Sequence, residues 1–281
     1  MVDLAPHNPY QLTLRSPLLI AAGCLGYGVE YARLLGLHEA THVGIGALVT
    51  RTTTLHAWRS PPLPRLVETA AGLLALDNSH NPGLRTVIER YAPSWASWSL
   101  PVIVSIASSN LAECTEMAGM LEGVAGVAGI ELQLVACSAT SGVRTGQFTT
   151  AVRRATLLPL LVKLPLNAQI GECAQAATTA GADALTLVGG FAAAFPDPVH
   201  GTLLHGQLCG PATLPLALAT VSRLAPQLTI PLVAGGGITS SRDARAFLAA
   251  GATAVAIGSA LLADPRIAER IGNALGPELA V

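Results

Sequence analysis

Charged side chains are scarce in this chain: 12% of its 281 residues are charged and 4% are aromatic, whereas 51% are hydrophobic. The formal net charge of −1 argues against a basic surface that binds nucleic acid or anionic membranes. The charge-free run from Phe247 to Ala263 is interrupted by Gly251 and Gly258, and a spanning helix needs about 20 consecutive apolar residues. We therefore expect no nucleic-acid partner and no membrane insertion.

Closely spaced cysteine pairs are also lacking. The five cysteines, at positions 24, 114, 137, 173 and 209, form no CxxC pair and are odd in number. This spacing disfavours structural disulfides, iron–sulphur ligation and a metal site, and it is typical of a reducing compartment. The first residues, Met1 to His7, lack the basic region and apolar core of a signal peptide. We therefore expect a cytoplasmic protein.

Eight short aliphatic segments alternate with helical patterns along the chain. Alternation without a break in composition predicts parallel βα units joined by right-handed crossovers, and the length is typical of one barrel. We therefore predict an α/β fold, a single (β/α)8 TIM barrel spanning residues 1–281, with a long functional loop at Thr52–Pro82. The predicted strands are Pro17–Ala22, Val43–Thr50, Val102–Ile106, Ile130–Val135, Pro159–Leu164, Ala184–Val188, Pro231–Ala234 and Ala254–Ile257.

Small residues follow the last two predicted strands. Gly235, Gly236 and Gly237 allow the backbone to approach a ligand closely, and a serine at 240 or 241 is suited to cap the next helix. Gly258 and Ser259 repeat the arrangement after the eighth strand. Strand ends that run into helix N-termini form an anion cradle, which barrels use for phosphate groups after strands seven and eight. The pattern predicts a phosphate site without specifying the chemistry.

Two cations stand at the ends of predicted strands. Lys163 places an ammonium on an otherwise apolar strand, where it needs an anionic or electron-rich partner. It is either an ion-paired or snorkelling side chain, a contact to a cofactor, or a Schiff-base lysine. Arg51 offers a guanidinium fork for bidentate binding, although a surface ion pair explains its position equally well.

Two further groups are candidates for substrate chemistry. Cys137 follows the fourth predicted strand and serves as a base or nucleophile only if its environment lowers its pKa; otherwise it is an inert thiol. Asp77, Asn78, Ser79 and His80 form a dense polar cluster before Asn81-Pro-Gly83, which is either a recognition loop or a solvated turn.

Several of these motifs together resemble the dihydroorotate dehydrogenases, especially the catalytic subunit of the bacterial class that works with a separate electron-transfer subunit. The similarity extends from about Ser16 to Pro265. It rests on Ser16-Pro-Leu-Leu-Ile-Ala-Ala-Gly-Cys-Leu-Gly-Tyr-Gly-Val-Glu-Tyr31, Leu48-Val-Thr-Arg-Thr-Thr-Thr-Leu55, Pro61-Pro-Leu-Pro-Arg-Leu-Val-Glu-Thr69, Asn81-Pro-Gly83, Gly210-Pro-Ala212 and the two glycine turns.

The resemblance implies an FMN-binding barrel with Lys163 at the position of the family's flavin-contacting lysine. It also implies a small-molecule substrate, a role in pyrimidine biosynthesis, a homodimer, and an FAD/iron–sulphur partner subunit that accepts electrons. The residues it assigns to the cofactor are Ala21, Ala22, Gly23, Arg51, Ser105, Lys163, Gly210, Gly236, Gly237, Gly258 and Ser259.

The substrate positions depart from the family pattern. Asparagines that the family uses to bind orotate correspond to Ala75 and Gly189, and the catalytic segment Asn-x-Ser-Cys-Pro-Asn becomes Gln133-Leu-Val-Ala-Cys-Ser138. The family's catalytic cysteine therefore aligns with Ala136, and Cys137 takes its role only if one residue bulges, with Ser138 beside it. Each lost hydrogen bond to a charged ligand is worth about 1.5–3 kcal/mol. We therefore expect a changed substrate, recognised by Arg51, Asp77, Asn78, Ser79, His80 and Gln133.

Three functions fit these observations. The first is an FMN-dependent dehydrogenase in which FMN N5 accepts a hydride, with His80 or Cys137 as proton acceptor. The second is a barrel that binds FMN or another phosphate without turnover, as a scaffold or accessory subunit. The third is a phosphate-binding aldolase with a Schiff base on Lys163, which leaves the family motifs unexplained. We favour the first.

Overall fold

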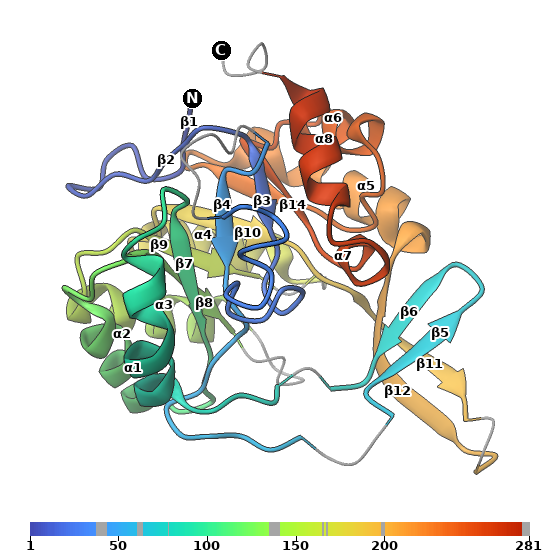
Figure 1. Ribbon diagram of the computed structural model, residues 1–281, viewed down its shortest axis with the longest axis horizontal. Coiled ribbons are helices and arrows are strands. Elements are labelled where there is room, and N and C mark those ends of the chain that lie inside the picture. The colour runs from blue at the N-terminus through green and yellow to red at the C-terminus, as the bar shows by residue number, and fades with distance from the viewer. Residues whose placement is uncertain are drawn as a thin grey trace.

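The computed structural model describes residues 1–37, 44–60, 64–77, 79–134, 141–164, 166, 168–197 and 200–276. Eight parallel strands close into a barrel in the order β3-β4-β7-β8-β9-β10-β13-β14 (Figure 1). Each of the eight predicted strands is confirmed, with ends that differ by a few residues. Their bounds are Leu18–Ile20 (β3), Ala47–Val49 (β4), Val102–Ile106 (β7), Val127–Gln133 (β8), Leu160–Lys163 (β9), Ala184–Leu187 (β10), Leu232–Ala234 (β13) and Ala254–Ile257 (β14).

Helices cover the outside of this barrel. Ser240 is the N-cap of α6, since its Oγ accepts a hydrogen bond from the amide of Asp243, as the sequence predicts. Helical patterns in the sequence predict five of the helices, at Ala112–Leu121, Ala168–Ala180, Leu214–Leu224, Arg242–Ala250 and Pro265–Leu275, but not α1, α3 or α7. The bounds are Leu84–Trp95 (α1), Leu111–Leu121 (α2), Gly142–Ala155 (α3), Ile170–Thr179 (α4), Leu214–Leu224 (α5), Ser241–Ala249 (α6), Ala260–Ala263 (α7) and Ile267–Leu275 (α8), with short 3-10 turns at Pro211–Thr213 (η1) and Ala225–Gln227 (η2).

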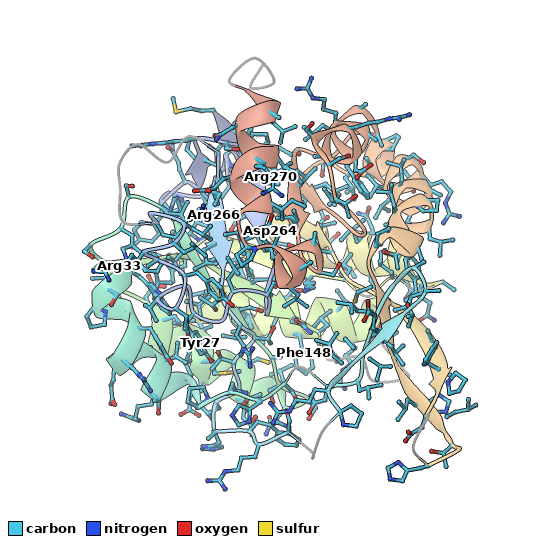
Figure 2. The ribbon with its side chains drawn as sticks, turned by 45° about the vertical axis from the view of Figure 1, so that its right-hand side comes forward. Tyr27, Arg33, Phe148, Asp264, Arg266 and Arg270 are labelled. Carbon is cyan, nitrogen blue, oxygen red and sulfur yellow. The ribbon has the colours of Figure 1, made fainter. Side chains whose placement is uncertain are left out.

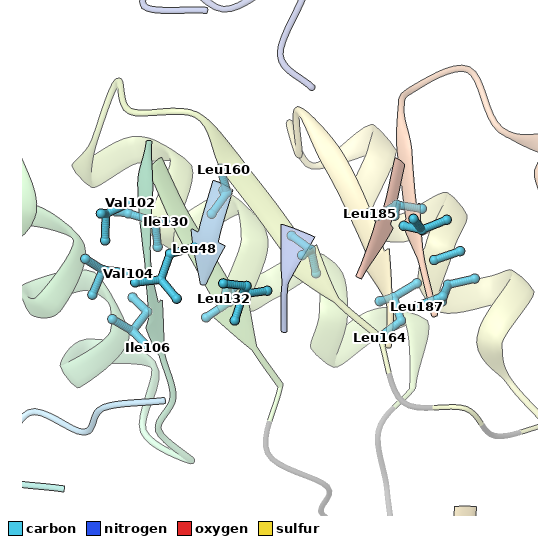
Figure 3. Close-up of a cluster of buried hydrophobic side chains, with 14 of the residues drawn as sticks. Leu48, Val102, Val104, Ile106, Ile130, Leu132, Leu160, Leu164, Leu185 and Leu187 are labelled. Carbon is cyan, nitrogen blue, oxygen red and sulfur yellow. The ribbon is translucent and has the colours of Figure 1, made fainter. Parts of the chain in front are cut away.

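The strands bury both of their faces, which explains their continuous apolar sequences. Outward-facing side chains such as Val104, Leu132 and Leu187 pack against the helices, as Figure 3 shows. Inward-facing side chains form a second cluster inside the barrel. Leu4 and Leu14, from the antiparallel hairpin of β1 (Val2–Asp3) and β2 (Thr13–Leu14), join this inner cluster. Because Leu12 approaches Gly129 near the start of β8, the hairpin closes the amino-terminal end of the barrel.

A second, four-stranded antiparallel sheet projects from the other end of the barrel (Figure 1). It pairs β5 (Leu66–Thr69), β6 (Gly72–Ala75), β12 (Leu203–Cys209) and β11 (Phe191–Pro196). The prediction that Thr52–Pro82 is one long loop was therefore wrong: its second half forms the β5–β6 hairpin. The edge strands β5 and β11 alternate exposed and half-buried residues and bury none of them fully, so their pairing depends on contacts between distant parts of the chain.

The carboxyl-terminal helix is joined to the barrel by a short charged turn. Arg270 of α8 makes an ion pair with Asp264, with Nη2 and Oδ2 2.6 Å apart, and both residues appear on the outer surface in Figure 2. In the part of the chain that the structure describes, no helix is both long and apolar enough to cross a membrane.

Candidate functional site

A cavity of about 550 Å³ opens at the carboxyl ends of the barrel strands, beside the projecting sheet. Active sites of such barrels lie at this end of the strands. Twelve of the residues predicted to bind the cofactor or the substrate line this one cavity, although they come from segments far apart in the chain. They are Ala21, Ala22, Gly23, Arg51, Asp77, His80, Lys163, Gly210, Gly236, Gly237, Gly258 and Ser259.

One wall of the cavity is a backbone cradle with no room for side chains. Gly237 has a φ of 73°, and a Cβ there would lie 2.7 Å from the Gly210 carbonyl oxygen. Gly236 has a φ of 139°, and a Cβ there would lie 2.8 Å from the Ala217 Cβ. Gly258, between β14 and α7, also lines the cavity, but an added Cβ there would meet only ordinary contacts. Because side chains are excluded at Gly236 and Gly237, backbone atoms form this part of the wall. Such a wall suits a phosphate group, which backbone amides can bind.

Asp243 makes hydrogen bonds at the start of α6, the helix that follows this cradle in the sequence. Its Oδ2 accepts hydrogen bonds from the Thr239 amide at 3.0 Å and the Thr239 hydroxyl at 3.1 Å. Burial alone would raise the Asp243 pKa, but the hydrogen bonds from Thr239 and Ser240 outweigh it and hold the pKa below its ordinary value of 3.8. The carboxylate therefore stabilises the start of α6 above that pH.

Replacing Asp243 with asparagine is expected to lower the free energy of unfolding by about 1 kcal/mol at pH 7. A group whose pKa is lowered on folding stabilises the protein above its unfolded pKa, and this contribution is lost as the pH falls through the folded pKa. The difference between the two proteins should therefore shrink as the pH falls below the ordinary value of 3.8. Urea unfolding at pH 7 and at pH 3 measures it, and an equal difference at both values would refute the assignment.

Lys163 ends β9 and reaches the cavity from inside the barrel. Its Nζ lies 3.9 Å from Oε1 of Glu131, a residue of β8 that is 1% exposed. Ser105 Oγ donates a hydrogen bond of 3.1 Å to the same carboxylate oxygen. The lysine is therefore ion-paired, which was one of the alternatives left open by the sequence, and it also lines the cavity. The two descriptions are compatible because the ammonium has three donors.

Ser105 and Gln133 lie beneath the cavity rather than in its wall. The hydroxyl of Thr52 is within 3.0 Å of Ser105 Oγ and 2.9 Å of Gln133 Oε1, so it joins β7 to β8. Ser105 is fully buried. Both residues are therefore hydrogen-bonded to Thr52 and are not part of the cavity wall.

Another part of the cavity wall carries three of the predicted substrate residues, Arg51, Asp77 and His80, whereas Ser79 does not line the cavity. Arg51 Nη1 donates a hydrogen bond of 3.1 Å to the His80 carbonyl oxygen, which ties the end of β4 to the loop after β6. The Ser79 amide donates to Asp77 Oδ1 at 2.8 Å, and the Ser79 hydroxyl bonds the same oxygen. Burial would raise the Asp77 pKa, but hydrogen bonds from serines and the nearby charge of Arg65 lower it overall. This wall thus presents a guanidinium and an ionised carboxylate.

Three predicted residues, Asn78, Cys137 and Ser138, lie outside the described residues. Within the described ranges, no group of three or more His, Cys, Asp or Glu side chains is arranged to hold a metal ion.

Sequence reasoning missed three residues that lie in the cavity wall or directly beneath it. Glu131 is a single acid in the apolar strand Ile130-Glu-Leu132, the same signal that singled out Lys163. Cys24 and Cys209 line the cavity as free thiols. Burial raises the pKa of Cys24 to about 11, although the charge of Lys163 opposes the shift. Both thiols stay protonated at neutral pH, since burial also raises the pKa of Cys209.

Comparison with known proteins gives consistent results. Residues 6–279 match the family described as dihydroorotate dehydrogenase. The chain is 38% identical over 274 residues to the dihydroorotate dehydrogenase B (NAD(+)) catalytic subunit of Desulforudis audaxviator, covering 92% of this chain and 87% of that protein. It is 35% identical over 283 residues to the protein of the same name from Geobacter sp. strain M21, covering 96% and 91%. For the Bacillus pumilus protein of that name the identity is 33% over 273 residues, covering 92% and 86%.

Proposed function

The chain belongs to the dihydroorotate dehydrogenase family, and from that premise we propose that it is an FMN-dependent dehydrogenase whose substrate is a small molecule other than dihydroorotate. One observation carries the proposal. The glycine cradle and Lys163 line the same cavity as Arg51, Asp77 and other predicted substrate residues.

The cavity wall fits a phosphate-bearing flavin. Gly236 and Gly237 have positive φ values and are packed so closely that side chains are excluded, which suits contact between backbone and a phosphate group. Lys163 supplies a positive charge from the barrel interior, where the far end of a flavin ring gains negative charge on reduction. When bound, FMN supplies a hydride acceptor at N5. Ala21, Ala22 and Gly23, after β3, leave a flat wall without bulky side chains.

The substrate wall supports the change of substrate. At Ala75 and Gly189, where the family resemblance expects asparagines, the cavity is lined by a methyl group and by bare backbone. Each lost hydrogen bond to a charged ligand weakens binding by about 1.5–3 kcal/mol. The ionised Asp77 adds a negative charge that would repel an anion such as dihydroorotate, while Arg51 offers a bidentate donor.

We assign the remaining roles from the sequence. Arg51, Asp77, Asn78, Ser79, His80 and Gln133 recognise the substrate, and Cys137 with Ser138 provides the base. The protein is one domain, works in the cytoplasm as a homodimer, and passes electrons to an FAD/iron–sulphur subunit. The names of the relatives as catalytic subunits support a separate partner.

Visible absorption of the purified protein tests the cofactor. We expect a yellow protein that releases FMN on denaturation, identified by chromatography against FMN, FAD and riboflavin standards. A colourless protein that binds none of the three when they are added would refute the proposal.

A further inference from the structure

Glu131 lies below the proposed flavin site and has no part in the function assigned so far. It is on β8, 1% exposed, and its neighbours across the barrel interior include Leu19, Val49 and Leu161. A carboxylate in such surroundings is stable only with a positive partner and hydrogen-bond donors. The structure provides both, in Lys163 and Ser105. Lys163 is the single lysine of the chain.

The hydroxyl groups around Glu131 form a chain that ends on its carboxylate. Ser105 Oγ donates to Glu131 Oε1, Thr52 Oγ1 lies 3.0 Å from Ser105 Oγ, and Gln133 is the next contact. The Thr52 hydroxyl donates to Gln133 Oε1 at 2.9 Å. Ser105 therefore gives the carboxylate a hydrogen-bond donor from within a polar network that joins Thr52, β7 and β8.

We propose that Glu131 is a positioning residue that acts through Lys163: it holds the ammonium at the cavity floor and offsets part of its charge. The inference rests on the proposed FMN function. Lys163 favours the reduced flavin because two electrons and one proton, delivered as a hydride, leave negative charge on the ring. A neighbouring carboxylate weakens that preference. Glu131 therefore sets the reduction potential below the value that an unpaired lysine would give.

The test is Glu131→Gln in the flavin-bound protein, with the midpoint potential measured anaerobically against a reference dye. We expect the reduction equilibrium to rise about tenfold, about 30 mV for a two-electron couple. Binding of FMN to the oxidised apoprotein, measured by quenching of flavin fluorescence, should change less than the potential. Glu116→Gln, an exposed change of the same type on α2, should leave the potential unchanged.

A double variant separates an action through Lys163 from a direct action on the flavin. In a Lys163→Met background, Glu131→Gln should raise the potential much less than it does beside the lysine, because no ammonium is left for Glu131 to position. The inference would be overturned if Glu131→Gln left the potential unchanged or lowered it. It would also be overturned if the potential rose equally with and without the lysine. Neither result would affect the proposed function. Failure of the proposed function is seen separately, as a wild-type protein that binds no flavin.

Discussion

Replacing Lys163 with methionine is expected to reduce both the stability of the apoprotein and the reduction of its flavin. Removing one partner of a buried ion pair costs about 3–5 kcal/mol, and we expect the lower end because the lysine side chain is 15% exposed. The buried carboxylate of Glu131 is then left without its cation. The loss of a charge aimed at the reduced ring should lower the reduction equilibrium about hundredfold, about 60 mV. Urea unfolding and potentiometry measure the two effects.

Two matched variants test whether these effects come from the charge of Lys163 and its ion pair with Glu131. Lys163→Arg keeps the positive charge and should retain most of the stability. Lys163→Met combined with Glu131→Gln removes both charges and should recover stability to within about 1 kcal/mol of wild type, without recovering the potential. If the methionine variant is as stable as wild type, the ion pair between β8 and β9 does not contribute as the structure indicates.

Replacing Gly237 with alanine is expected to yield protein without cofactor. The residue has a φ of 73°, which a side chain makes costly by about 1–3 kcal/mol, and the new Cβ would lie 2.7 Å from the Gly210 oxygen and 2.8 Å from the Leu214 nitrogen. The cradle must then open. We expect FMN affinity to fall about hundredfold or more, equivalent to about 2.7 kcal/mol. Titration of the apoprotein with FMN measures the change.

A variant at Gly258 distinguishes a loss of FMN binding from a loss of folding stability. At Gly258 an added Cβ would lie 3.6 Å from Cys24 Sγ and 3.7 Å from the Ala21 Cβ, which are ordinary contacts. Gly258→Ala should therefore keep the stability of the apoprotein and still lower FMN affinity about tenfold. Gly119→Ala, in α2 with no atom within 4 Å of the new Cβ, is the control and should gain about 0.5–1 kcal/mol. Normal FMN affinity in both cradle variants would show that the phosphate is bound elsewhere.

The barrel was predictable because each of its strands carries a local signal. A strand buried on both faces is a continuous aliphatic run, such as Val102–Ile106, and needs no partner to be recognised. The projecting sheet has no such signal: Phe191–Pro196 contains three consecutive alanines, and its pairing with Leu203–Cys209 and then β6 is decided by distant contacts. Helix α1 was missed because Pro93 lies within it and because its N-cap residue, Gly83, has no side chain to cap the helix.

The site was predictable to a similar extent. The cradle can be recognised from the sequence because strand, glycines and capping serine follow one another within a few residues. The depth of the cavity cannot, because it depends on how the β5–β6 hairpin packs beside the strand ends. Glu131 was missed because only residues at the ends of strands were considered, whereas Glu131 lies two residues before the end of β8. Thr52 was missed because its role depends on its contacts with Ser105 and Gln133, which are distant in the sequence.

We propose that this protein binds the family's flavin but does not oxidise the family's substrate. The most direct measurement is an anaerobic titration of the purified protein with dihydroorotate while the visible flavin band is recorded, followed by dithionite. We expect the band to be unchanged by dihydroorotate and bleached by dithionite. Stoichiometric bleaching by dihydroorotate would contradict the account, because it would require a rebuilt orotate pocket around Asp77 and His80.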